Sequence, residues 1–205
     1  MAHLRAHCLG AVLALLLMVA GPASAQPEPL PLGSSMPNAT LERVDGTTVQ
    51  LSNVAGETGT VLLFWSNQCP WVDRYEDRVA DLVERFQPQG IQFVRVNAND
   101  ASAFPQESLD ASQERADARD YASMYVRDSG SSLARALGAT RTPHAFVFDA
   151  DETLIYTGTI DDSPSGPEGV TKAYLANALE ALTSGGDVPA PRTKAFGCTI
   201  KFANP

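Results

Sequence analysis

Apolar positions in this sequence form short strand-length runs separated by stretches with helical spacing. Two alternating runs flank Asp45-Gly46, which predicts a β-hairpin closed by a tight turn. The continuous apolar run at residues 60–66, TVLLFWS, has the length and character of a strand buried on both faces. Apolar side chains then recur at helical spacing over residues 70–86, and residues 91–100 alternate again. We therefore expect a strand–helix–strand unit with parallel strands.

The second half of the chain continues this alternation of element types, without an internal repeat or a second domain. We expect a surface helix within residues 101–121 opened by Pro105, a short strand at 123–128, a short helix ended by Gly138, two strands turning through 149–152, and a helix over 169–186. This order of elements predicts the α/β fold class.

The apolar run at residues 60–66 stops at a corner that carries a single cysteine. Cys69 is followed by Pro70, which suits the first turn of a helix because its missing N–H has no intrahelical partner there. Unpaired backbone N–H groups and the positive end of the helix dipole favour a thiolate at this place. Ser66, three residues earlier, is positioned to donate a hydrogen bond to the sulfur. The alternative interpretation is a buried and inert cysteine.

The N-terminal residues 1–25 have the pattern of a secretory signal peptide. Arg5 precedes an apolar core, and Ala23-Ser24-Ala25 forms a small-residue cleavage site. The apolar core is shorter than the roughly 18 residues that a membrane anchor needs. We therefore expect a periplasmic or secreted protein with no membrane span after cleavage.

Composition divides the remaining chain into three parts. Residues 26–38 are rich in Pro and Ser and predict an extended lead-in, residues 39–186 hold the predicted domain, and residues 187–205 form a tail with Cys198. The whole chain has 15 basic and 24 acidic residues; without Arg5 the balance is 14 minus 24, or −10. This acidic character argues against nucleic acid and anionic membranes as partners.

Two cysteines, Cys69 and Cys198, remain after signal cleavage, in a compartment where disulfides persist. Three interpretations stay open. The two thiols form a redox pair in which Cys198 resolves an oxidised Cys69, they form a structural bridge, or they are unrelated.

Other chemistries have weak support. His144 is the only histidine after the signal segment, so no metal site is predicted. The sequence has no nucleophile elbow, phosphate-binding glycine loop or dinucleotide fingerprint, and no bound cofactor is expected. Asp161-Asp162 are interpreted as turn residues. Trp65 and Trp71 flank the cysteine corner. We interpret them primarily as core residues, and secondarily as an apolar rim for a partner.

Five motifs carry a family resemblance across residues 39–202. FWSNQCPWVDRYEDR, VRVNAND, ATRTPHAFVFD, YTGTIDDS and GCTIKF, in this order, resemble the exported thioredoxin-like redoxins of the alkyl hydroperoxide reductase and thiol-specific antioxidant (AhpC/TSA) superfamily. The resemblance implies a thioredoxin-like fold: a central mixed β-sheet flanked by helices, with an N-terminal hairpin and a C-terminal tail. It also implies a cis Pro143 after Thr142, thiol-disulfide or peroxide chemistry at Cys69, and an external thiol as electron donor.

The chain departs from this family pattern at two places. Relatives often carry C-x-x-C at the corner, and Ser66 takes the place of the first cysteine, so a dithiol cycle within that motif is impossible. What remains is similar to the T-x-x-C pattern of peroxiredoxins, whose hydroxyl residue positions peroxide. Peroxiredoxins place an arginine near the position of Pro143, whereas Arg141 lies two residues away. This difference argues against strong peroxidase activity.

Three hypotheses follow. The first is an exported antioxidant thiol oxidoreductase in which Cys69 attacks a peroxide or a partner disulfide and Cys198 resolves the product. The second is a monothiol disulfide-exchange protein that uses Cys69 alone. The third is a thioredoxin-fold binding or folding-helper module without catalysis, which the loss of the first cysteine favours. The sequence does not specify the oligomeric state.

Overall fold

The computed structural model describes residues 27–203, and the predicted signal peptide lies outside them. Seven strands form one sheet in the order β2-β1-β5-β4-β3-β7-β8, and a second sheet pairs β6 with β9. The strands are β1 Thr40–Arg43, β2 Thr48–Gln50, β3 Gly59–Trp65, β4 Ile91–Asn97, β5 Met124–Arg127, β6 Arg141–Thr142, β7 His144–Asp149, β8 Leu154–Gly158 and β9 Cys198–Thr199. The helices are α1 Pro70–Phe86, α2 Leu109–Ala118, α3 Ser132–Leu137 and α4 Tyr174–Ser184, with 3₁₀ turns η1 Leu51–Val54, η2 Gln87–Gln89, η3 Pro105–Glu107 and η4 Pro167–Gly169.

The large sheet is mixed. Strand β3 is parallel to β4, and β4 is parallel to β5, while β7 and β8 continue the sheet in antiparallel pairing. The predicted hairpin is present as β1 and β2, with Thr40 opposite Gln50. The predicted α/β class, with a central mixed sheet flanked by helices, is confirmed.

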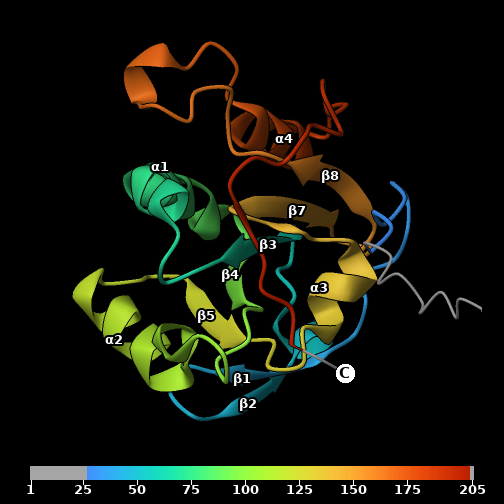
Figure 1. Ribbon diagram of the computed structural model, residues 1–205. Coiled ribbons are helices and arrows are strands. Elements are labelled where there is room, and N and C mark those ends of the chain that lie inside the picture. The colour runs from blue at the N-terminus through green and yellow to red at the C-terminus, as the bar shows by residue number, and fades with distance from the viewer. Residues whose placement is uncertain (1–26, 204–205) are drawn as a thin grey trace, which may run out of the picture.

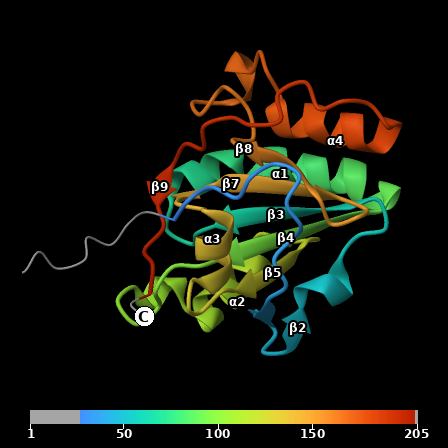
Figure 2. The same cartoon turned by 90° about the vertical axis from the view of Figure 1, so that its right-hand side faces the viewer.

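Strand β3 is the centre of the core, because all seven of its residues are buried. Its side chains alternate between the two faces of the sheet. Val61, Leu63 and Trp65 pack in the cluster that contains α1 and α4, whereas Leu62 and Phe64 pack in the cluster that contains α3. Figures 1 and 2 show these layers, with α1 and α3 on opposite sides of the sheet.

Helix α1 begins and ends where the sequence predicts. Pro70 occupies its first turn, and the chain leaves the helix through η2 to Gly90, whose φ of 82° is in the left-handed region that favours glycine. Its buried side chains lie on the face toward β3 and are Val72, Tyr75, Glu76, Val79, Val83 and Phe86. Burial of each apolar member contributes on the order of 1.5–3 kcal/mol, so α1 is held firmly against the sheet.

Helix α4 is shorter than the predicted helix over residues 169–186. It starts only at Tyr174, because the preceding amide groups bond to a loop instead of to one another. Thr171 and Lys172 donate their backbone N–H groups to the Asp162 carboxylate. The predicted stop is correct, since Gly185 takes a left-handed conformation. None of the helices within residues 27–203 is long and apolar enough to cross a bilayer.

The tail after α4 runs along β8 and then across the end of the sheet where β3 stops (Figure 2). Thr157 donates to the carbonyl of Pro191, and its own carbonyl accepts from Thr193. Further on, β9 pairs with β6, and Ile200 donates to the carbonyl of Thr140. The tail is therefore fixed to the domain by backbone hydrogen bonds at several points.

The Asp161-Asp162 pair does more than form a turn. Asp161 is buried and lies 2.6 Å from the guanidinium of Arg78 on α1, and it also accepts hydrogen bonds from Tyr75 Oη and the Ser163 amide. Asp161 lies in the segment that leads to α4, as the sequence predicts, but its ion pair with α1 was not predicted. Its carboxylate connects α1 to the loop before α4.

We predict that Asp161→Ala lowers the free energy of unfolding by about 3–5 kcal/mol, because it leaves the largely buried Arg78 guanidinium without its partner. The matched control is Glu180→Ala, which removes an exposed ion pair with Arg85 and is expected to cost about 0–1 kcal/mol. Chemical denaturation of both variants measures the difference. Equal losses would contradict the structural role of Asp161.

Candidate functional site

Cys69 lies at the junction of β3 and α1, as the residue that precedes the helix. Its carbonyl accepts the amide hydrogens of Val72 and Asp73, and its sulfur donates to the carbonyl of Thr142 at 3.2 Å. The side chain is buried, with 1% exposed. The Thr142–Pro143 peptide bond is cis, as the family resemblance implies. The structure thus brings Cys69, Thr142 and Pro143 together.

Cys198 is brought to the same place by the tail. In the β6–β9 pair, Cys198 lies directly opposite Thr142, whose carbonyl accepts from the Cys69 thiol. Both thiols are unbonded to any other cysteine. Burial raises the pKa of the Cys198 thiol to about 12, and the neighbouring Cys69 sulfur raises it further, while the Trp71 amide acts in the opposite direction. At neutral pH, Cys198 is therefore protonated beside Cys69.

Gly197 lets the tail lie this close to β6. Its φ is 144°, and a Cβ at this position would lie 2.0 Å from the carbonyl oxygen of Thr142. No side chain fits in that space without displacing backbone atoms. Glycine at this position therefore sets the distance between the tail and the strand that holds the Cys69 thiol.

Ser66 does not donate to the cysteine sulfur, so that expectation is wrong. Its hydroxyl donates to Oε1 of Glu107 at 2.6 Å and accepts from the amide of Gln68 at 3.2 Å. A carboxylate is a stronger acceptor than a neutral thiol, which explains the preference. Ser66 therefore holds the loop before Cys69 rather than the sulfur itself.

Glu107 is the site residue that sequence reasoning missed. Its side chain is buried, with 4% of the residue exposed, and it also accepts from the Asn67 amide at 2.9 Å and from Asn97 Nδ2 at 2.7 Å. The only signal in the sequence was the turn at Pro105. Because three donors converge on one buried carboxylate, Glu107 fixes the loop that delivers Cys69 to the helix.

Arg141 is hydrogen-bonded to the tail on either side of Cys198. Its exposed guanidinium donates to the carbonyl of Gly197 and to Oγ1 of Thr199 at 2.8 Å, and so it holds the tail. His144 is hydrogen-bonded to Thr157 Oγ1, and burial lowers its pKa to about 3, with the nearby charge of Arg192 adding to the effect. Its imidazole is therefore neutral at physiological pH and supplies no positive charge.

Comparison with known proteins agrees with this geometry. Residues 32–157 match the model of the AhpC/TSA family. The chain belongs to the AhpC/TSA family. It is 30% identical over 78 residues to the thiol-disulfide oxidoreductase ResA of Halalkalibacterium halodurans. That match covers 38% of this chain and 44% of the relative, so it spans less than half the length of this curated protein.

Solved structures extend the likeness to most of the AhpC/TSA chain. An uncharacterized conserved protein from Geobacillus kaustophilus is 33% identical, with a TM-score of 0.81 over 89% of this chain and 98% of that one. A putative thiol:disulfide interchange protein DsbE from Chlorobium tepidum has a TM-score of 0.61 at 19% identity, over 75% of this chain and 99% of that one. This second likeness supports the predicted thioredoxin-like fold alone.

The two tryptophans that flank the AhpC/TSA site have different surroundings. Trp65 is fully buried, and its Nε1 donates to Tyr121 Oη at 3.0 Å, so it is a core residue. Trp71 is partly buried, and its ring meets that of Phe196 edge-on, with centroids 4.6 Å apart. Phe196 is 44% exposed. Trp71 and Phe196 thus form an apolar rim beside the two thiols.

Within residues 27–203, the side chains of His, Cys, Asp and Glu nowhere gather in a group of three or more that could hold a metal ion. Two thiols that form no disulfide, Cys69 and Cys198, lie at the AhpC/TSA site.

We predict that Gly197→Ala lifts the tail from β6, because the added Cβ would overlap the Thr142 carbonyl. The loss of roughly one net hydrogen bond makes local opening of the tail about tenfold more frequent, so the buried Cys69 is alkylated about tenfold faster. Mass spectrometry after treatment with iodoacetamide measures this rate. The control is Gly186→Ala, where the nearest atom would lie 3.6 Å away and no change is expected. An unchanged rate in Gly197→Ala would mean that the tail does not control access.

A second prediction concerns the pKa of Cys198. Cys69→Ser replaces the neighbouring sulfur, which raises this pKa, by a hydroxyl that does not ionise, so the pKa falls from about 12. At a fixed pH near 8, iodoacetamide then modifies Cys198 faster than in the parent protein, about tenfold for each pKa unit. Equal free energies of unfolding of Cys69→Ser and the parent protein would show that the tail is still in place. Equal alkylation rates would contradict the coupling of the two sulfurs.

Proposed function

We propose that this AhpC/TSA family member is an exported thiol oxidoreductase in which Cys69 and Cys198 form the redox pair. The observation that carries the proposal is the strand register that sets Cys198 opposite Thr142, whose carbonyl accepts from the Cys69 thiol. In this proposal Cys198 supplies the second thiol, which the corner motif lacks because Ser66 stands in place of a cysteine. A dithiol cycle is then possible although the corner motif has only one cysteine.

The cycle transfers two electrons to an oxidised partner. The Cys69 thiolate attacks a partner disulfide, forms a mixed disulfide and releases one partner thiolate, which takes up a proton. Cys198 gives up its proton and attacks the Cys69 sulfur, so the second partner thiol leaves and a Cys69–Cys198 disulfide forms. An external dithiol reduces this disulfide and is itself oxidised, which restores both thiols without a bound cofactor.

The order of attack follows from the pKa of Cys198. Burial raises the pKa of Cys198 to about 12, which disfavours Cys198 as the attacking thiol of the reduced protein, and we assign the first attack to Cys69. Once Cys69 is in a mixed disulfide, its sulfur has neither a negative charge nor a proton to share. The pKa of Cys198 then falls, and the Trp71 amide favours its thiolate at the moment when it must attack.

Disulfide exchange is supported better than peroxide reduction. Ser66 and Arg141 are the residues that a peroxide-handling site would use, and their donors are directed to Glu107 and to the tail. The curated relatives are named thiol-disulfide oxidoreductases, and we extend that reaction class to this chain. We propose a protein disulfide as the substrate, bound against the Trp71–Phe196 rim. The signal-like residues 1–25 support export.

The test uses the chain from residue 26 onward as wild type, Cys69→Ser and Cys198→Ser, with insulin or hydrogen peroxide as oxidant and a dithiol as reductant. We expect Cys69→Ser to lower insulin turnover at least about 100-fold, because the attacking thiol is gone. When the dithiol is left out, Cys198→Ser is expected to accumulate a mixed disulfide through Cys69, identified by mass spectrometry. Under the same condition, wild type is expected to end with a Cys69–Cys198 disulfide.

Each alternative gives a different result. Faster formation of the Cys69–Cys198 disulfide with peroxide than with insulin would make peroxide the substrate. Undiminished turnover in Cys198→Ser would establish a monothiol mechanism. Absence of any reaction at Cys69 with either oxidant would overturn the proposal and favour a binding module.

A further inference from the structure

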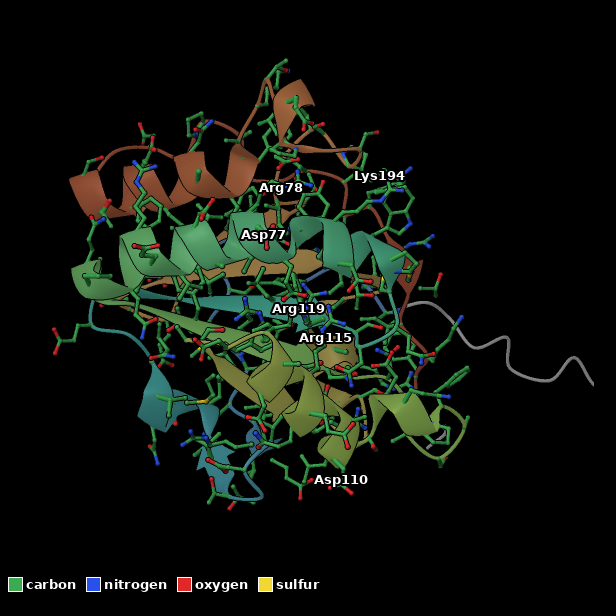
Figure 3. All side chains as sticks on the ribbon, turned by 90° about the vertical axis from the view of Figure 1, so that its left-hand side faces the viewer. Asp77, Arg78, Asp110, Arg115, Arg119 and Lys194 are labelled. Atoms are coloured by element: carbon green, nitrogen blue, oxygen red, sulfur yellow. The ribbon has the colours of Figure 1, made fainter. Side chains whose placement is uncertain are left out.

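A cavity of about 570 Å³ lies on the face of the domain that carries α1 and α2, apart from the thiols. Its walls come from α1, from η2, from β4 and from the segment that follows α2. In Figure 3, which faces this side, Asp77 lies on α1, with Arg119 between α1 and α2. Neither cysteine nor Thr142 lines the cavity. Its volume lies in the range of small-molecule sites.

A buried arginine lines this cavity from the sheet. Arg95 on β4 is 2% exposed, and its guanidinium lies 3.9 Å from the Tyr121 ring centroid and 5.4 Å from that of Trp65. One amino group donates to Ser123, while Nε is buried without a partner. Burial lowers the pKa of Arg95, but a guanidinium stays charged at neutral pH. Within residues 27–203, no carboxylate lies within ion-pair distance of it.

The neighbouring carboxylates are directed to a different arginine. Glu76, which also lines the cavity, and the exposed Asp73 both bind Arg115. Oε1 of Glu76 is buried without a partner. A buried charge without a counter-ion is costly, and a guanidinium binds carboxylates in a planar, two-pronged geometry. An anionic ligand group at Arg95 would satisfy this need, while the charge of Glu76, which lines the same cavity and already acts on Arg95, favours a ligand that also carries a positive group.

The outer part of the cavity has the opposite character. The wall there contains three exposed acidic residues, Asp77, Glu84 and Asp120. Among the described residues that line this outer part, Arg119 is the one basic residue. This excess of negative charge disfavours a simple anion and favours a ligand that also carries a positive group. Between the two charged regions, the wall contains Ala80, Val83, Pro88 and Ala122.

We propose that this cavity binds a small zwitterion. Its carboxylate lies on Arg95, its apolar chain lies along α1, and its ammonium group lies among the acidic residues at the mouth. The chemical class is an amino acid whose two charges are separated by several carbon atoms, or a short peptide. This site is separate from the thiol chemistry, and neither proposal depends on the other.

The probe is 6-aminohexanoate, with hexanoate and hexylammonium as matched ligands that each lack one charge. Titration calorimetry of the chain from residue 26 onward is expected to give a Kd on the order of 1 mM for a ligand of this size. Each matched ligand is expected to bind at least about tenfold more weakly, because one charged contact is lost. Arg95→Met is expected to abolish binding, whereas Lys194→Met, which removes an exposed positive charge on the tail outside the cavity lining, leaves it unchanged.

A second variant keeps the test valid if Arg95→Met does not fold. Ala122→Trp changes an exposed residue of the wall, so the fold is retained while the indole fills the cavity. We expect it to remove 6-aminohexanoate binding without changing the circular dichroism spectrum. The proposal is overturned if folded wild type does not bind the probe, if hexanoate and hexylammonium bind equally well, or if binding survives in Ala122→Trp.

Discussion

The backbone pairing of β6 with β9 is the interaction on which the site depends. It fixes Cys198 opposite Thr142, covers Cys69, and directs Arg141 toward the tail. The pair has only two residues in each strand, so its stability comes from the close approach that Gly197 permits and from the tail contacts along β8. A short sheet thus determines the surroundings of both thiols.

The buried polar residues next to β3 also determine the position of Cys69, because they fix the loop that precedes it. Glu107, Asn97 and Ser66 form a buried network that fixes the loop, and Arg95 lies buried further along the same sheet face. Such groups cost stability unless every donor and acceptor is satisfied. The network around Glu107 is well connected, whereas Arg95 keeps an unpartnered donor. The Glu107 network therefore supports the loop, whereas the unpartnered donor of Arg95 is available to a ligand.

Sequence reasoning was accurate where structure follows from local pattern. Apolar spacing and Pro70 predicted the bounds of α1, and the continuous apolar run predicted β3. It was inaccurate where distant groups compete: Asp162 delays the start of α4, and Glu107, 41 residues away, takes the Ser66 hydroxyl. The alternation of residues 91–97 also gave no sign that Arg95 is buried, because periodicity does not show which face a loop or helix will cover.

The separation of the two cysteines along the chain has a consequence for biogenesis. Cys69 is synthesised well before Cys198, and at about 5–20 residues per second the interval is on the order of ten seconds. During that interval the β3–α1 corner lacks the tail that covers it in the finished domain. In the exported protein that we propose, the nascent chain would therefore present an unprotected thiol to other cysteines, and folding of the tail ends that exposure.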